Sequence, residues 1–130
     1  MKQLDFLDKY EPQAYALLRI IAGAMFMFHG VQKILGWLGH TMPVGSQLWF
    51  GGLIELGCGA LIALGLFTRY AALLASGTMA VAYIQFHWKL EFAGYKFLPG
   101  VNQGELAVVY CFLFLFIALR GAGIWSLDRK

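Results

Sequence analysis

Six ionisable side chains lie inside or at the ends of long apolar runs in this sequence. They are Arg19, His29, Lys33, Glu55, His87 and Glu105. A charged side chain near the centre of a lipid bilayer costs roughly 2.5–3.5 kcal/mol on insertion scales, so such groups rarely face lipid. We therefore expect them to pair with one another or to line a polar cavity. Any chemistry that the chain performs is expected among them.

The apolar runs are candidates for membrane-spanning helices. Of the residues 60% are hydrophobic and 13% are charged, whereas soluble domains carry about 25% charged residues. A transmembrane helix needs about 20 mostly apolar residues. Four windows approach this length, at about 14–35, 48–67, 70–88 and 105–119. The sequence therefore predicts an all-α fold, an integral membrane four-helix bundle in antiparallel up-down-up-down order, with residues 1–130 forming a single domain.

Basic residues are distributed unevenly over the predicted connections. Three of the ten, Lys33, Lys89 and Lys96, fall at one end of the helices, and the other seven fall at the end that holds both termini. Because cytoplasmic loops are enriched in Lys and Arg, both termini are predicted to be cytoplasmic. The first window is interpreted as an uncleaved anchor, since its apolar run exceeds that of a secretory signal. No basic cluster accompanies the net charge of +3, which argues against nucleic-acid binding.

The first window collects its charged groups on one face. Arg19, Ala22, Phe26, His29 and Lys33 are 3, 4, 3 and 4 residues apart, the spacing that places side chains along one stripe of a helix. We expect this stripe to face the interior of the bundle. Arg19 would then lie near the cytoplasmic end, with His29 and Lys33 toward the outer end.

The second window places a carboxylate among small residues. One face of this predicted helix carries Gly51, Gly52, Glu55, Gly59 and Ile62. Glycines around an acid let a neighbouring backbone approach closely. Antiparallel packing on the first helix would bring the carboxylate to the depth of His29, so a contact with His29 or Lys33 is predicted.

A purely structural interpretation of these charges is also available. Lys33–Glu55 and Arg19–Asp128 would be ion pairs that set the register of the helices, a role that buried pairs can have without adding net stability. Cys58 and Cys111 both fall within spans and are interpreted as small buried hydrophobic side chains. A transient redox pair is the alternative if their two helices touch.

Taken in order, several short segments make the chain similar to the DoxX family of small four-helix bacterial membrane proteins. The segments are Arg19 with 28–33 (FHGVQK), 55–57 (ELG), 65–69 (GLFTR), 79–80 (MA) with His87, 103–105 (QGE) and 121–128 (GAGIWSLD). The resemblance implies a bacterial inner-membrane protein. The family is similar to the DoxD subunit of a thiosulfate:quinone oxidoreductase, and some members are associated with membrane redox complexes.

The resemblance directs attention to a quinone as a possible lipophilic ligand. A quinone needs an apolar slot with aromatic walls and a few hydrogen-bonding groups at its oxygens. His29 and Glu55 would exchange protons there, and Lys33 would polarise an oxygen. The expected binding residues around these three are Phe26, Tyr83, His87, Trp88 and Glu105.

Two other functions stay open at this point. The chain could be a non-enzymatic assembly partner whose glycine-rich faces dock other membrane or redox subunits, or form a homo-oligomer. It could also be a small proton-coupled transporter that uses Glu55, although no inverted repeat is visible. Haem bound between His29 and His87 is disfavoured because the two differ in depth by about two turns. No metal site is expected.

Overall fold

The computed structural model describes residues 2–128, and all regular secondary structure in this part of the chain is helical. Its α-helices are connected and extended by short 3-10 and π-helical segments. The elements are η1 (Lys2–Tyr10), α1 (Glu11–Leu35), α2 (Gln47–Leu64), α3 (Thr68–Ala82), η2 (Tyr83–Trp88), η3 (Ala93–Tyr95), α4 (Pro99–Asn102) and α5 (Glu105–Arg120). No strand occurs within the described range.

The long helices fall where the four apolar windows predicted them. The third window differs most, because the α-helix ends at Ala82 and continues as one π-helical segment to Trp88. Among the described residues, two helical stretches are long and apolar enough to cross a membrane, Gln3–Leu35 and Gln47–Leu64. The other two long helices, α3 with 15 residues and α5 with 16, are shorter than the 18 residues taken as the minimum length for a span.

Local signals explain where α1 and α2 begin and end. The Ser46 side chain accepts a hydrogen bond of 3.2 Å from the backbone N–H of Trp49, and so caps the first turn of α2. Gly36 and Gly65 follow the last residues of α1 and α2 with φ of 72° and 70°. Glycine adopts this left-handed conformation without steric cost, which makes it the usual residue just past a helix.

The backbones of α1 and α2 are in close contact. A Cβ atom added to Gly59 would lie 2.4 Å from the backbone N of Met27, and one added to Gly30 would lie 2.3 Å from the backbone N of Leu56. The two helices therefore approach through glycines that alternate along the seam. This confirms for Gly59 the expectation that glycines beside Glu55 admit a neighbouring backbone. A Cβ atom added to Gly52 would meet the side chain of Lys33, and one added to Gly51 would meet nothing within 4 Å.

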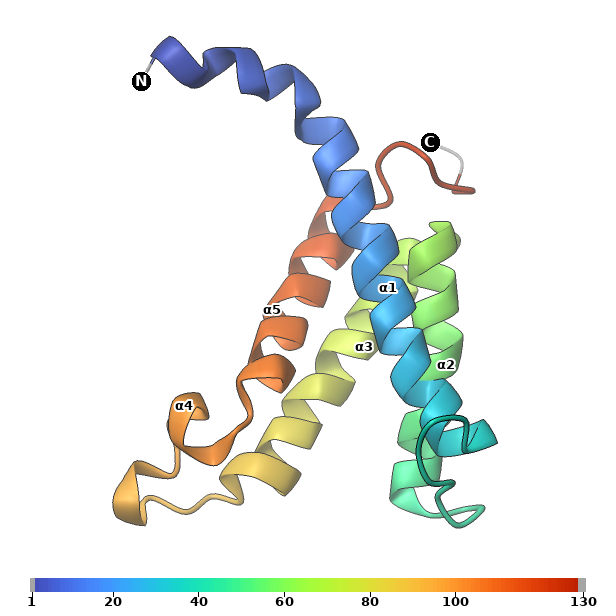
Figure 1. The fold of residues 1–130 in the computed structure, drawn as a ribbon, viewed down its shortest axis with the longest axis vertical. Helices are drawn as coiled ribbons and strands as arrows, with labels where there is room; N and C mark the ends of the chain where they lie inside the picture. The colour runs from blue at the N-terminus through green and yellow to red at the C-terminus, as the bar shows by residue number, and fades with distance from the viewer. Residues whose placement is uncertain (1, 129–130) are drawn as a thin grey trace.

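The helices are arranged as two pairs that diverge toward one end. Figure 1 shows α1 beside α2 and α3 beside α5, with both described chain ends at the end where the pairs meet and the segment η1 turning away from α1. Aromatic and alanine side chains join the pairs. Phe26 of α1 packs against Phe114 of α5 with ring centroids 4.8 Å apart, and Ala72 and Ala75 of α3 are fully buried.

The C-terminal tail is held at the end where the pairs meet, by a fully buried arginine. Arg19 of α1 has no exposed surface. Its Nε donates to the carbonyl of Ile62 at 3.0 Å, and its two terminal nitrogens donate to three tail carbonyls. Those tail residues are Ala122, Ile124 and Trp125. The guanidinium group thus donates to four backbone carbonyls, one in α2 and three in the tail.

The predicted Arg19–Asp128 ion pair is therefore wrong. Asp128 accepts hydrogen bonds instead from the backbone N–H groups of Phe67 at 2.7 Å and Thr68 at 3.0 Å. These are free donors at the start of α3, where a carboxylate also complements the positive end of the helix dipole. Backbone groups satisfy both charges, so no direct pairing of the two side chains is needed.

Substitution of Gly59 by alanine should destabilise the protein, whereas the same change at Gly57 should not. The added methyl group at Gly59 would meet the backbone of α1, but at Gly57 nothing lies within 4 Å. Thermal unfolding in detergent should show a lower midpoint for Gly59→Ala. Gly57→Ala should be equal to or above the parent, since alanine favours helix by up to about 1 kcal/mol over glycine. Equal midpoints for the two variants would contradict the backbone contact.

Replacement of Arg19 by lysine should release the tail. A lysine ammonium lacks the planar fork that reaches four carbonyls at once. Limited trypsin digestion should then cleave after Arg120 faster in Arg19→Lys than in the parent. The exposed control Lys96→Arg should leave that rate unchanged. An unchanged rate in Arg19→Lys would show that the tail does not depend on the guanidinium.

Candidate functional site

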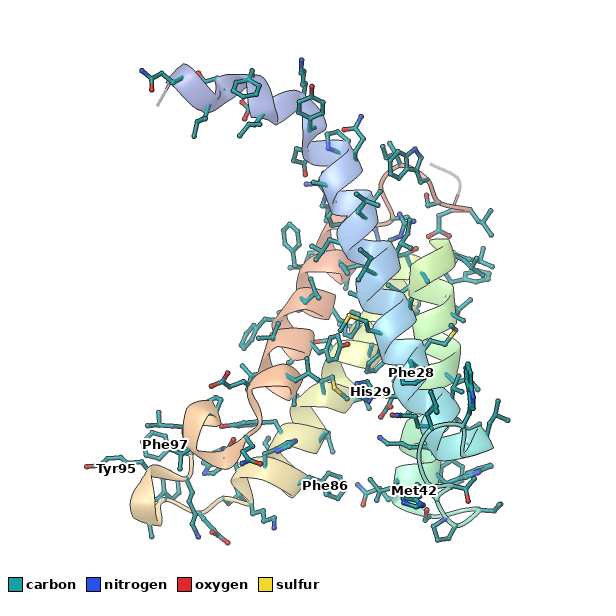
Figure 2. The ribbon with its side chains drawn as sticks, in the orientation of Figure 1. Phe28, His29, Met42, Phe86, Tyr95 and Phe97 are labelled. Atoms are coloured by element: carbon teal, nitrogen blue, oxygen red, sulfur yellow. The ribbon has the colours of Figure 1, made fainter. Side chains whose placement is uncertain are left out.

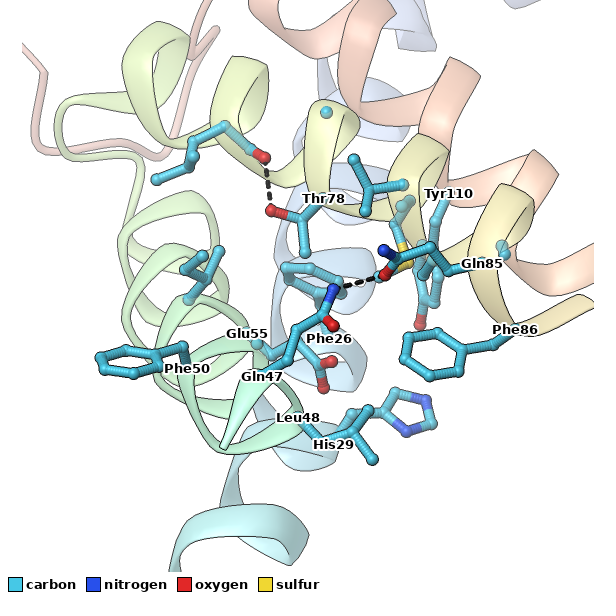
Figure 3. A pocket seen from close by; sticks show the side chains of 18 of the residues that line it. Phe26, His29, Gln47, Leu48, Phe50, Glu55, Thr78, Gln85, Phe86 and Tyr110 are labelled. Atoms are coloured by element: carbon cyan, nitrogen blue, oxygen red, sulfur yellow. Dashed lines mark hydrogen bonds between the residues drawn. The ribbon is translucent and has the colours of Figure 1, made fainter. Parts of the chain in front are cut away.

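A large cavity lies between the two diverging helix pairs. It has a volume of about 1030 Å³, and residues from α1, α2, α3, η2 and α5 line it. Most of its lining is apolar, including Phe26, Leu48, Ile54 and Phe86. Figure 3 shows these walls together with a few polar side chains that extend between them. An apolar cavity with few polar groups is typical of a site for a small lipophilic molecule.

The strongest polar feature of the cavity is an ion pair between α1 and α2. Lys33 Nζ lies 2.5 Å from Glu55 Oε1, with 26% of the lysine side chain exposed and 5% of the glutamate side chain. The pair confirms the predicted contact between the basic stripe of α1 and the carboxylate of α2. It forms because the glycine seam holds the two helix backbones within reach of both side chains.

Two buried oxygens in the same cavity lack a hydrogen-bond partner among residues 2–128. They are Oε2 of Glu55 and the hydroxyl of Tyr110. Both residues line the cavity and are almost completely buried. Since an unpaired buried polar group costs about 1–3 kcal/mol, these atoms indicate where a ligand would gain hydrogen bonds. Figure 3 shows both side chains extending into the pocket, from α2 and α5 respectively.

Tyr110 belongs to an aromatic group at the inner end of the cavity. Its ring stacks on Phe114 with centroids 5.3 Å apart and meets the edge of Phe26 at 5.6 Å. His29 packs edge-on against Tyr110 at 6.5 Å. The sequence did not single out Tyr110, because α5 is apolar on nearly all sides and no periodicity marks one face of it.

Two amide side chains bridge the mouth of the cavity at the end remote from the chain termini. Gln47, at the start of α2, donates a hydrogen bond to Gln85 of the π-helical segment η2. Phe86 and His87 follow in η2 and also line the cavity. In Figure 2 the Phe86 side chain extends from η2 toward the α1–α2 pair. π-helical turns are rare and often occur at functional sites, and neither glutamine was predicted.

Three of the predicted site residues lie outside the cavity lining. The Tyr83 hydroxyl donates to the carbonyl of Phe97 at 2.6 Å, and the Trp88 indole N–H donates to the carbonyl of Glu91 at 3.0 Å. Both side chains therefore support the connection between η2 and α5, residues 89–104, which is called the outer loop because it lies at the end of the molecule remote from the chain ends. Glu105 starts α5 as predicted, but its side chain is exposed. Tyr83 and Trp88 both lie in the π-helical segment η2, where side chains point in other directions than they would in a continuous α-helix.

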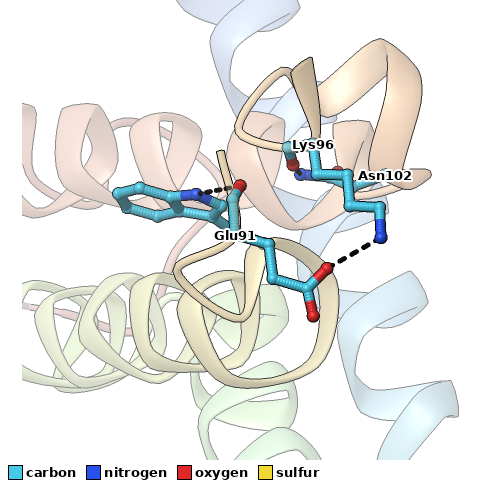
Figure 4. Close-up of polar contacts among 4 residues, drawn as sticks. Glu91, Lys96 and Asn102 are labelled. Atoms are coloured by element: carbon cyan, nitrogen blue, oxygen red, sulfur yellow. Dashed lines mark hydrogen bonds and ion pairs between the residues drawn. The ribbon is translucent and has the colours of Figure 1, made fainter. Parts of the chain in front are cut away.

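The outer loop is a separate, ordered polar cluster. Lys96 Nζ lies 2.9 Å from Glu91 Oε2, and Asn102 donates to the Lys96 carbonyl at 2.8 Å (Figure 4). The hydrogen bond from Lys96 lowers the pKa of Glu91, which favours the ionised carboxylate. Tyr95 and Phe97 extend outward from this loop in Figure 2. None of these five residues lines the cavity.

The two cysteines are free and occupy different environments. Cys58 is buried in the core. Cys111 is partly buried beside Ser76, whose hydroxyl donates to the Cys111 carbonyl at 2.7 Å and lies 3.6 Å from its sulfur. These surroundings agree with the interpretation of both as small core side chains.

Fold and site together define the class: a helical membrane protein with an apolar cavity and one ion pair inside it. The chain belongs to the DoxX family, whose model matches residues 14–88. It is 42% identical to an uncharacterized protein of Haemophilus influenzae over 98% of this chain and 97% of that protein. It is 27% identical to an uncharacterized membrane protein of Mycobacterium tuberculosis over 92% of this chain and 82% of that protein. No solved structure matches it significantly.

The ion pair predicts an asymmetric response to substitution. Lys33→Met would leave the Glu55 carboxylate buried without its cation, whereas Glu55→Leu would leave a lysine that is partly exposed and can extend toward solvent. Thermal midpoints in detergent should therefore decrease most in Lys33→Met, less in Glu55→Leu and least in Glu55→Gln. The double variant Lys33→Met/Glu55→Leu should recover part of the loss. A Lys33→Met protein as stable as its parent would show that the pair carries no buried charge.

Proposed function

We propose that this protein crosses the bacterial inner membrane as an antiparallel four-helix bundle with cytoplasmic termini and binds a quinone in its cavity. It would act as a subunit of, or an accessory to, a quinone-linked redox system. The observation that carries this proposal is the Lys33–Glu55 pair with its unpartnered oxygen in an otherwise apolar cavity. A quinone and its reduced quinol both join an apolar ring and tail to two polar oxygens. Lys33 can donate a hydrogen bond to either form, and the unpartnered carboxylate oxygen can accept one from a quinol hydroxyl.

The orientation of the site supports a ligand that enters from the bilayer. The cavity extends along α3 from Tyr70 to the π-helical segment η2, and its ion pair Lys33–Glu55 lies toward the end remote from the described chain ends. With cytoplasmic termini, that end faces the outer half of the membrane. Exposed apolar side chains occur on the faces of the long helices that do not line the cavity, for example Ile21, Val109 and Phe112. These faces suit contact with lipid, in which quinones dissolve.

Within the site, we assign roles by the chemistry of each group. Lys33 would polarise a ligand oxygen, and Glu55 and His29 would exchange protons with it. Phe26 and Tyr110 would form the aromatic wall. The electrons of any quinone reaction would be exchanged with a redox protein partner in the membrane.

Docking of another membrane subunit is the second candidate function, and the outer loop favours it. Leu90, Phe92 and Tyr95 are each more than three-fifths exposed in this loop. Exposed aromatic and aliphatic groups on an ordered loop suit either a partner subunit or the membrane interface. In that case the cavity would have a structural role, and substitutions inside it would not affect partner binding.

Binding of a short-chain quinone tests the principal proposal. The protein in lipid nanodiscs should bind decyl-benzoquinone saturably in calorimetric titration. Tyr110→Phe should weaken binding by roughly five- to ten-fold, because it removes a buried, unpartnered hydroxyl that can donate a hydrogen bond to a quinone carbonyl. The control Glu91→Gln removes a carboxylate that lies outside the cavity and should bind like the parent. Absence of saturable binding, or equal affinity in Tyr110→Phe, would refute the proposal.

A further inference from the structure

We infer that the cavity binds the dihydroxy form of its ligand, the quinol, more tightly than the dicarbonyl form, and that Glu55 makes the distinction. The inference rests on the proposed quinone site and concerns which redox form that site prefers. The two forms have nearly the same size and apolar surface. They differ at the two ring oxygens, which donate hydrogen bonds in the quinol but only accept them in the quinone.

One of the two carboxylate oxygens of Glu55 is free to accept a hydrogen bond. Its Oε1 is engaged by Lys33 Nζ at 2.5 Å, and its Oε2 has no partner among residues 2–128. A carboxylate paired with a lysine is acceptor-only. The group that satisfies Oε2 must therefore be a hydrogen-bond donor. A quinol hydroxyl meets this requirement, whereas a quinone carbonyl would place its lone pairs against those of the carboxylate.

Tyr110 and Lys33 do not distinguish the quinol from the quinone. The Tyr110 hydroxyl is also buried and unpartnered, but a hydroxyl can donate to a carbonyl or accept from a quinol. Lys33 can donate to either form, and its partly exposed side chain gives its other N–H groups access to solvent. Of these three groups, only the Oε2 atom of Glu55 can hydrogen-bond to the quinol and not to the quinone.

A preference for the quinol also fits the proton chemistry assigned to the site. The donated hydrogen bond points from the ligand hydroxyl to a carboxylate, which is the geometry from which a base removes a proton. Glu55 would thus be placed to accept a proton from the reduced ligand. His29, which lines the same cavity and packs on Tyr110, is the next titratable group available.

Paired titrations of the two forms test the inference. The protein in nanodiscs is titrated anaerobically with decyl-benzoquinone, with the corresponding quinol, and with the quinol's dimethyl ether. The ether keeps the ring and tail but lacks both hydroxyl donors. The parent should bind the quinol roughly 10- to 100-fold more tightly than the quinone, the gain from a hydrogen bond to a charged group. The ether should bind no better than the quinone.

Two variants separate selectivity from general binding. Glu55→Gln supplies an amide that both donates and accepts, so the ratio of the two affinities should fall close to one. Tyr110→Phe should weaken both forms while keeping the ratio. Equal affinity of the parent for quinol and quinone, or an unchanged ratio in Glu55→Gln, would overturn the inference while leaving the proposed site intact. Failure of both forms to bind would instead overturn the proposed function.

Discussion

The close contact between the α1 and α2 backbones is the constraint from which the site follows. Gly30 and Gly59 allow the helices to approach until a single added methyl group would collide with the opposite main chain. At this separation a lysine on one helix and a glutamate on the other meet directly. Larger residues at the seam would move the helices apart and leave both charges in an apolar environment, where each is costly.

The two ends of the molecule satisfy their charged side chains in different ways. At the end near the chain termini, Arg19 donates to backbone carbonyls and Asp128 accepts from backbone N–H groups. Their hydrogen bonds hold the tail and the start of α3 in place. At the opposite end, Glu55 keeps one oxygen unpartnered within the described residues. The first arrangement is saturated and structural. The second retains capacity for a ligand, which is why the proposed function is assigned to the cavity.

Much of the helical architecture could be predicted because its signals are local. Apolar windows located the four long helices, and the 3-4-3-4 spacing from Arg19 to Lys33 identified the inward face of α1. Other features depend on contacts between distant segments and were not predictable. The bonds of Arg19 to the tail involve backbone carbonyls, which carry no residue signature. Tyr110 lies on a helix that is apolar almost all round, so no pattern distinguished its inward face.

The sequence by itself determined that the chain is helical, that charged side chains gather along one stripe of its first helix, and that a carboxylate lies among glycines in its second. These are properties of composition and spacing, which a helix converts directly into faces. Only the tertiary structure decided which groups are left with unmet hydrogen bonds. In the folded chain Tyr83 and Trp88 donate hydrogen bonds to the outer loop, whereas Tyr110 lines the cavity. Gln47 and Gln85 form a hydrogen bond across the mouth of the cavity. Hydrogen-bond satisfaction is a property of three-dimensional neighbours, and spacing along one helix does not specify what the facing helix presents.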